Sequence, residues 1–448
     1  MKRTFAALLA AVVLVFCGVE PADAASKLKA TVVKVVRNAA SSGKIKKVEK
    51  TTGAKKTTST ASVSKTAAQK ETAKTNAKAA VKNANSSSAQ NLGKEIEVGL
   101  LTQQSQVSLN CLSEVKAEVG SKTWQTFKKG TNLSVSLDGK QIVINGKRAG
   151  SSVILKPTAD GAAFSVKGNR YRGTMKLFPS KMGGITVVNA LPLEEYLLGV
   201  VPCEVSPSWH MDALCAQAVA ARSYALFHMN GYRSSGFDVT DDTVCQVYRG
   251  VSAEVAETNE AVRRTAGEVV TYNGQVIDAV FHANGGGATE NCENVWGSEV
   301  PYLKGVKEEA YSVLDKAWTK TVSKENFQNN LGIGKLKSIR LSKLTRGKST
   351  GVDRGISGRV LTFTVAGDKK DVRTTGERIQ ALYDLPSTLF DIKISGKNVV
   401  FTGYGSGHGL GLSQWGAQAM AEKHGNGKDY YKKILIHYYT GTTVTKVY

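Results

Sequence analysis

The chain places one carboxylate and one arginine where an enzyme could use them. Glu204 lies in a proline-containing segment, VVPCEVSPSW, directly before a long helical pattern. Arg222 lies within that pattern, on a face that is otherwise built from small and apolar residues. An acid beside apolar walls suits general acid catalysis, and a buried arginine requires an acidic partner. A carboxylate at a helix start can also simply stabilise the helix dipole, so the pair alone leaves both interpretations open.

A second polar segment, FHANGGGATENCENVW at residues 281–296, could form one wall of a cleft. It combines the amide of Asn284 and the hydroxyl of Thr289 with three consecutive glycines, which allow another chain or a ligand to approach the backbone closely. Tyr302 and Lys304 follow downstream. A glycine run by itself usually marks a turn, so this segment supports a site only together with the others.

A third segment, GYGSGHGLGLSQWGAQAM at residues 403–420, alternates glycines around His408 and opens a helix at Ser413 and Gln414. The indole of Trp415 and the amide of Gln414 suit a sugar, by stacking on a pyranose face and by hydrogen bonding to its hydroxyls. The alternative is that Trp415 is a core residue of the last helix pair.

Patterns typical of other chemistries are incomplete. The glycines of residues 405–411 do not follow the GxGxxG spacing of a dinucleotide site, and no acidic ribose partner follows. Ser413 lacks the glycine two residues later that a nucleophile elbow requires. The six histidines show no HxxxH spacing, although Cys245, His282 and Cys292 could still converge in space.

The first residues predict export. Residues 1–24 begin with two basic residues, continue with an apolar run and end in Ala22-Asp23-Ala24, which is typical of a cleaved secretory signal. The apolar run is short for a membrane span, and no later run replaces it. Five cysteines follow, so at least one remains without an intrachain partner, and a Cys245–Cys292 bridge is the first pairing to test.

The next segment, residues 25–93, is a basic linker rich in Lys, Ala, Ser and Thr. Residues 26–90 contain fifteen Lys and Arg against Glu49 and Glu71, more than half of the chain's net charge of +23. Such a sequence cannot bury enough apolar surface to offset its chain entropy, so we expect disorder. Because the chain is exported, we expect anionic envelope polymers rather than nucleic acid as its partners, while a tether without a specific partner is the alternative.

The remaining sequence predicts an α+β fold: a strand-rich lobe at 94–190 and a mixed helical and strand catalytic region at 191–448, together forming a cleft. Alternating or β-branched runs predict strands at 95–101, 107–112, 133–137, 141–144, 151–155, 163–166 and 184–188. Helical spacing predicts helices from about 209 to 229, 253–266, 375–383, 413–423 and 428–438. Further strands are expected at 268–272, 276–281, 336–343, 359–365, 370–373 and 388–393.

From about residue 171 onward the chain resembles the stage II sporulation protein D and amidase-enhancer family. The motifs that carry the resemblance occur in the family's order: Asn189–Tyr196 (NALPLEEY), Gly199–Glu204 (GVVPCE), Ala216–Tyr224 (AQAVAARSY), Cys245–Tyr248 (CQVY), Asn284–Gly286 (NGG), Val295-Trp296, Pro301–Lys304 (PYLK) and Gly407–Gln418 (GHGLGLSQWGAQ).

The resemblance implies a wall-associated protein that acts on peptidoglycan. Sporulation-type members are lytic transglycosylases that cleave glycan strands, preferentially after the stem peptides have been removed, whereas amidase-enhancer members are described as modifiers of wall amidases. The family's catalytic glutamate corresponds to Glu204 and its required arginine to Arg222. The remaining motif residues are expected to contact substrate: Gln246, Asn284, Thr289, Tyr302, Lys304, His408, Ser413 and Gln414.

The resemblance also bears on metal binding and on mechanism. Some members hold a metal through Cys and His upstream of the CQVY motif, but residues 237–244 here contain neither, so we predict no metal and no cofactor. One acid suffices for a lytic transglycosylase, since the muramic acid C6 hydroxyl itself attacks the anomeric carbon. A direct salt bridge from Arg222 would lower the pKa of Glu204, so we expect Arg222 to position the loop or bind substrate.

Overall fold

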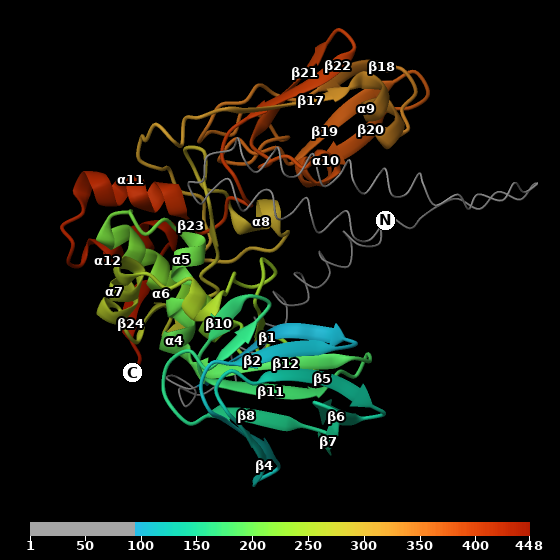
Figure 1. The fold of residues 1–448 in the computed structure, drawn as a ribbon. Coiled ribbons are helices and arrows are strands. Elements are labelled where there is room, and N and C mark those ends of the chain that lie inside the picture. Colours follow the sequence, from blue (N-terminus) through green and yellow to red (C-terminus); the bar gives the residue numbers. More distant parts are fainter. Residues whose placement is uncertain (1–94) are drawn as a thin grey trace, which may run out of the picture. The chain divides into compact units, whose positions relative to one another are not determined.

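The computed structural model describes residues 95–448, all of which belong to one compact unit. This part of the chain contains both helices and several sheets, and a run of strands precedes the first helix, which confirms the predicted α+β class (Figure 1). The predicted signal segment at 1–24 and basic linker at 25–93 lie outside the described residues, and the predicted domain boundaries stay predictions.

The first part of the described chain forms two sheets around one core. Alternation of buried and exposed side chains, as in β5 where Leu133 and Val135 point inward, lets each strand bury one face. The seven-stranded sheet has the order β13 (Val239–Thr240), β1 (Glu95–Gln104), β12 (Ile185–Pro192), β11 (Thr174–Pro179), β8 (Val153–Pro157), β3 (Val115–Val119) and β4 (Lys122–Phe127). The six-stranded sheet has the order β10 (Asn169–Tyr171), β9 (Phe164–Val166), β2 (Val107–Cys111), β5 (Asn132–Asp138), β6 (Gln141–Ile144) and β7 (Lys147–Gly150).

A cluster of helices follows β12 and surrounds α6 (Met211–Phe227). Every side chain of α6 from Asp212 to Ser223 is buried, so the helix packs on more sides than the one apolar face that its spacing indicates. The small residues of AQAVAA explain this, because they let neighbours approach the helix from several sides. These neighbours are α4 (Leu193–Leu198), α5 (Val201–Glu204), α7 (Ala256–Arg264), α11 (Gln414–His424), α12 (Tyr430–Tyr438) and the strand β14 (Glu268–Tyr272), which pairs with β15 (Gln275–Val276) and β24 (Thr443–Lys446).

Residues 318–403 form a module with its own core, inserted between the glycine-rich segments. Buried Phe327, Phe390 and Phe401 lie in a hydrophobic cluster separate from that of the rest of the chain. Two three-stranded sheets and two helices enclose it: β17 (Trp318–Ser323), β22 (Asn398–Gly403) and β21 (Phe390–Ser395); β18 (Leu336–Arg340), β19 (Thr362–Gly367) and β20 (Val372–Thr375); α9 (Lys324–Leu331) and α10 (Gly376–Tyr383) (Figure 1).

A short parallel pair links the two glycine-rich segments on either side of this module. β16 (Phe281–His282) pairs with β23 (Leu412–Ser413), and α8 (Cys292–Val295) follows β16. The predicted strand at 276–281 is wrong for residues 277–280, which lie between the end of β15 and the start of β16. The chain bends there, because the Val280 N–H donates to the Asp278 carbonyl at 2.9 Å. The Cys245–Cys292 bridge is also wrong, since both residues are free thiols.

Candidate functional site

Glu204 is the last residue of the four-residue helix α5. Pro202 stands at the start of this helix, where a missing N–H has no cost, and Val205 leaves it in an extended conformation (φ −136°, ψ 155°). The chain then crosses to His210, whose side chain caps α6 by accepting from the Asp212 N–H. The sequence VPCEVSPSWH thus presents one carboxylate at the exit of a short helix.

The Glu204 carboxyl is held in a packed environment. Burial raises its pKa to about 7, while hydrogen bonds from the Val247 backbone N–H and the Gln414 side chain act in the opposite direction. The Val247 N–H lies 3.3 Å from Oε1. Among the described residues, no cation contributes to this shift. The carboxyl is therefore partly protonated near neutral pH, as a general acid has to be.

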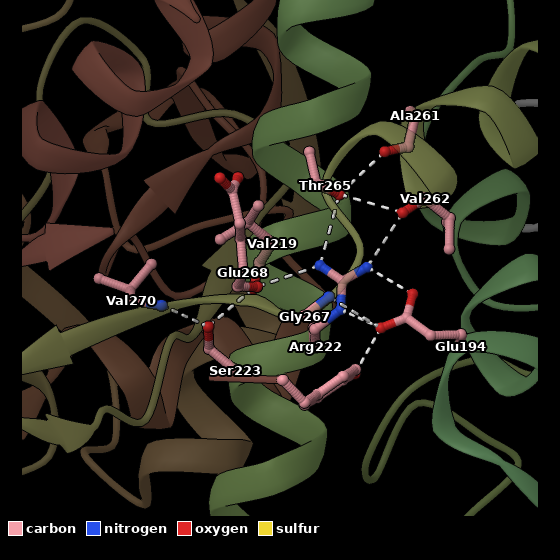
Figure 2. Close-up of polar contacts among 11 residues, drawn as sticks. Glu194, Val219, Arg222, Ser223, Ala261, Val262, Thr265, Gly267, Glu268 and Val270 are labelled. Atoms are coloured by element: carbon pink, nitrogen blue, oxygen red, sulfur yellow. Dashed lines mark hydrogen bonds and ion pairs between the residues drawn. The ribbon is translucent and has the colours of Figure 1, made fainter. Parts of the chain in front are cut away.

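Arg222 pairs with Glu194 of α4 rather than with Glu204 (Figure 2). Its Nε and one terminal nitrogen each donate to a Glu194 carboxylate oxygen at 2.7 Å. The other donors reach the Val262 and Glu268 carbonyls and the Thr265 hydroxyl at 3.1–3.4 Å. The side chain is fully buried. All five donors of the guanidinium are therefore used inside the protein, and this supports the positioning role rather than substrate contact.

Gln246 precedes Val247 and belongs to a buried set of hydrogen-bonded groups. Its amide donates to the Ala221 carbonyl of α6, and its oxygen accepts from the Tyr196 hydroxyl, each at 3.3 Å. The ring of Tyr196 packs on that of Tyr248 with centroids 4.9 Å apart. These contacts fix the CQVY segment against α4 and α6. Burial favours a supporting role for Gln246, and its contact with substrate stays a prediction.

The start of α11 brings Ser413 and Gln414 to the site. The Ser413 hydroxyl caps the helix by accepting from the Gly416 N–H and also accepts from the Gly285 N–H, at 3.3 and 3.0 Å. Gln414 bonds Glu204 and donates to the buried Gln217 of α6 at 3.4 Å. Of the predicted binding side chains, Gln414 is the one that contacts the Glu204 carboxyl in the described part of the chain.

His408 and Asn284 order the two glycine-rich loops. The Asn284 and Ser406 backbones exchange hydrogen bonds at 3.0 and 2.8 Å. The His408 ring bonds the Phe281 carbonyl at 2.9 Å and accepts from the Leu410 N–H. Burial lowers the pKa of His408 to about 4, so the imidazole is neutral at physiological pH. These contacts of His408 hold the two loops together. Substrate binding by His408 or by Asn284 stays a prediction.

Thr289, Tyr302 and Lys304 occupy neighbouring turns. The buried Thr289 hydroxyl accepts from the Val306 N–H at 2.9 Å, and the Tyr302 hydroxyl accepts from the Asp278 N–H at 3.2 Å. The partly exposed Lys304 ammonium donates to Glu299 at 2.7 Å. A direct role in binding stays a prediction for all three.

Sequence reasoning missed two acids. Glu194, in the NALPLEEY motif, could have been found as the acid that the buried Arg222 requires. Glu308 is buried beneath the start of α11, where it accepts from the Gly287 N–H at 2.8 Å; burial raises its pKa while bonds from Ser413 and Gly287 oppose the shift. Nothing in its local sequence, GVKEEAY, distinguishes it from an exposed acid.

The cavity that the structure contains at the inserted module is separate from Glu204. It has a volume of about 310 Å³ and is lined by residues of 290–297, 359–362 and the start of α10. Within residues 95–448, no three His, Cys, Asp or Glu side chains gather in a way that could hold a metal ion, and no helix is long and apolar enough to cross a membrane. The absence of a cofactor stays a prediction.

Comparison with known proteins finds family models and relatives that match parts of this chain. The family model described as stage II sporulation protein matches residues 181–272, which include Glu204 and Arg222, and a domain of unknown function matches residues 317–411. The chain is 35% identical over 329 residues to an uncharacterized protein of Brachyspira hyodysenteriae, covering 71% of this chain and 86% of that protein.

Two named relatives come from Bacillus subtilis. Stage II sporulation protein D is 34% identical over 323 residues, covering 67% of this chain and 89% of that protein. The amidase enhancer is 31% identical over 386 residues, covering 74% of this chain and 53% of that protein.

Proposed function

The chain belongs to the stage II sporulation protein D family, and from that premise we propose that it is an exported lytic transglycosylase. Its substrate is the glycan strand of peptidoglycan, preferentially after removal of the stem peptides, and its products end in 1,6-anhydro-muramic acid. The observation that carries the proposal is Glu204, one carboxyl with a pKa raised to about 7 and with no cation among the groups that shift it.

The proposed reaction uses Glu204 twice. The protonated carboxyl gives its proton to the glycosidic oxygen as the bond from that oxygen to the anomeric carbon breaks. The C6 hydroxyl oxygen of the same muramic acid residue then bonds to the anomeric carbon and returns its proton to the carboxylate. No water is consumed, so the second carboxylate of an ordinary glycosidase is not required.

The surroundings of Glu204 suit both halves of this cycle. Burial favours the neutral acid, whereas the Val247 N–H and the Gln414 amide stabilise the carboxylate that forms after proton donation. Because a cation would hold the group permanently ionised, the engagement of Arg222 with Glu194 supports the proposal.

The test is incubation of purified protein with peptide-denuded glycan strands. We expect release of anhydro-muramyl fragments, and loss of this release in Glu204→Gln, which keeps the shape but cannot transfer a proton. The matched control is Glu195→Gln. Glu195 lies on α4, and its side chain is 41% exposed to solvent. Equal activity of Glu204→Gln and wild type would contradict the proposal.

A second candidate is a non-catalytic protein that binds the wall and activates an N-acetylmuramoyl-L-alanine amidase. The observation that favours it is the 31% identity to a protein named amidase enhancer. Here an added wall amidase would be stimulated equally by wild type and by Glu204→Gln, with no glycan cleavage by either. The basic segment at 25–93 would supply attraction to anionic wall polymers in both cases, and its deletion would then weaken wall binding in a salt-dependent manner.

A further inference from the structure

Three aromatic rings from distant parts of the chain meet beside the start of α11. Trp209 comes from the loop between α5 and α6, Tyr311 lies between the polar segment at 281–296 and β17, and Trp415 is the second residue of α11. The Trp209 and Trp415 ring centroids lie 4.7 Å apart with planes tilted by 55°, and Tyr311 lies 6.2 Å from Trp415. We call these three residues the aromatic ledge.

The aromatic ledge is not explained by core packing. All three side chains are partly exposed. Trp209 packs against the main hydrophobic cluster, but neither Trp415 nor Tyr311 belongs to it or to the residues packed on it. Since the planes are tilted, neither neighbour lies flat on the Trp415 ring. The residue that seemed a possible core tryptophan from sequence therefore leaves aromatic surface to solvent.

The ledge adjoins the proposed acid through the chain itself. Trp415 directly follows Gln414, which bonds the Glu204 carboxyl. Trp209 follows Glu204 by five residues, so their Cα atoms are at most about 18 Å apart even in a fully extended chain. A polymer with one linkage at Glu204 would therefore reach the ledge with neighbouring units.

The polar groups around the ledge identify the kind of ligand. The Tyr311 hydroxyl bonds Glu422, the Gln418 amide also bonds Glu422 at 2.7 Å, and Ser206 and Ser208 expose hydroxyls nearby in sequence. Flat apolar rings bordered by hydroxyl, amide and carboxylate groups match a pyranose, which has an apolar face and a rim of hydroxyls. A lipid surface would instead require a broad apolar patch, and these rings are absent from the large exposed hydrophobic residues of the described chain.

We propose that Trp209, Trp415 and Tyr311 form a stacking subsite for pyranose rings of the glycan strand that flank the bond cleaved at Glu204. This inference rests on the proposed function for its choice of polymer. It adds residues that select and hold the strand, so the subsite governs binding and KM more than the chemical step.

The test measures binding apart from cleavage. Denuded glycan strands are titrated into full-length Glu204→Gln protein, and into the same protein carrying Trp209→Ala or Trp415→Ala. We expect each truncation to weaken binding about tenfold, which corresponds to ~1.4 kcal/mol. Trp415→Phe should recover most of the affinity because it keeps a flat ring. The control is Trp124→Ala, a partly buried tryptophan of β4 in the seven-stranded sheet.

Each outcome separates the subsite from the reaction. If wild type releases anhydro products but both truncations bind as tightly as their parent, the subsite is wrong and the proposed function stands. If binding depends on the tryptophans but wild type cleaves nothing, the subsite stands and the reaction is wrong. Equal loss in Trp124→Ala, or no binding of strands by the parent protein, would overturn the subsite. The thermal unfolding midpoint of each variant should match that of its parent, which checks that the fold is intact.

Discussion

At the scale of single residues, the proposed function depends on the protonation of Glu204. Desolvation and two N–H donors act against each other, and the result is a carboxyl that is about half protonated near pH 7. A free glutamate would be almost fully ionised there. Burial therefore keeps this carboxyl partly protonated, with neither a cation nor a second carboxylate among the groups that shift its pKa.

This balance predicts the pH dependence of cleavage. Only the protonated carboxyl can donate, so kcat/KM should be level below about pH 7 and fall about tenfold per pH unit above it. Gln414→Leu removes a bond that lowers the pKa of Glu204, so its alkaline limb should move to higher pH. The measurement is a pH profile of kcat/KM on denuded strands.

The control for this shift is Gln418→Leu. Gln418 lies one helical turn beyond Gln414, but it accepts from the His210 N–H and donates to Glu422 instead of contacting Glu204. Its alkaline limb should stay at the pH of the wild-type limb, whatever the level of kcat/KM. A limb that stays in place in Gln414→Leu, or that moves equally in both variants, would show that Gln414 does not set the Glu204 pKa.

Sequence reasoning reached Glu204 because its signal is local: an acid in a proline-containing loop before a helix. It predicted that Arg222 would position the loop or bind substrate rather than pair with Glu204, but it did not identify Glu194, whose contact with Arg222 joins residues 28 positions apart. Trp209 and Glu308 were missed for the same reason. Their neighbours come from other segments, and periodicity carries no information about such contacts.

At the scale of elements, Arg222 connects four of them by hydrogen bonds. It bonds Glu194 of α4, Val262 of α7 and the Glu268 carbonyl at the start of β14 from its place in α6. The Tyr448 hydroxyl and the Gly267 N–H also reach Glu194. Burial opposes ionisation of Glu194, but these bonds, led by Arg222, hold its pKa below the ordinary value. Since α5 lies between α4 and α6, this cluster fixes the helix that carries Glu204.

Breaking this cluster should destabilise the whole fold. Arg222→Met leaves Glu194 without its cation in a largely buried site, so we expect a loss of about 3–5 kcal/mol in the free energy of unfolding. The double variant Arg222→Met with Glu194→Met should lose less than the sum of the two single variants. Urea unfolding measures both.

The matched control is the exposed pair of Arg263 and Glu260 on α7, three residues apart. Arg263→Met should change stability by less than about 0.5 kcal/mol. A similar small effect for Arg222→Met would contradict the positioning role, as would unchanged stability with loss of glycan affinity alone.

Elements with strong periodicity were predictable and irregular ones were not. The helix expected at 209–229 and the strands expected at 133–137 and 141–144 lie close to α6, β5 and β6 of the structure. The strands β3, β4 and β17 and the helix α9 were missed, because long polar side chains on their exposed faces dilute the apolar pattern. The strands β11 and β22 were missed as well. The predicted strand at 276–281 failed because the chain bends at residues 278–280, and side-chain periodicity does not reveal such a bend.

At the scale of the whole described chain, two hydrophobic cores are joined by buried charged groups. Glu290 accepts from the backbone and hydroxyl of Ser357 at 3.0 and 2.6 Å, which ties the inserted module to the polar segment after β16. The Arg359 guanidinium donates to the Gly407 and Gly285 carbonyls, and burial lowers its pKa to about 10. The module thus braces both glycine-rich loops. The sequence could not reveal these contacts of Arg359, because the local pattern indicates only the first residue of a strand at 359–365.

The central claim is that the sugar's own hydroxyl, and not water, attacks the anomeric carbon while Glu204 moves the proton. The most direct measurement is digestion of denuded strands in oxygen-18-labelled water, with mass spectrometry of the new ends and Glu204→Gln as the control. We predict anhydro-muramyl ends that carry no label, and no products from Glu204→Gln. Labelled reducing ends, or unlabelled anhydro ends made equally by Glu204→Gln, would contradict the claim.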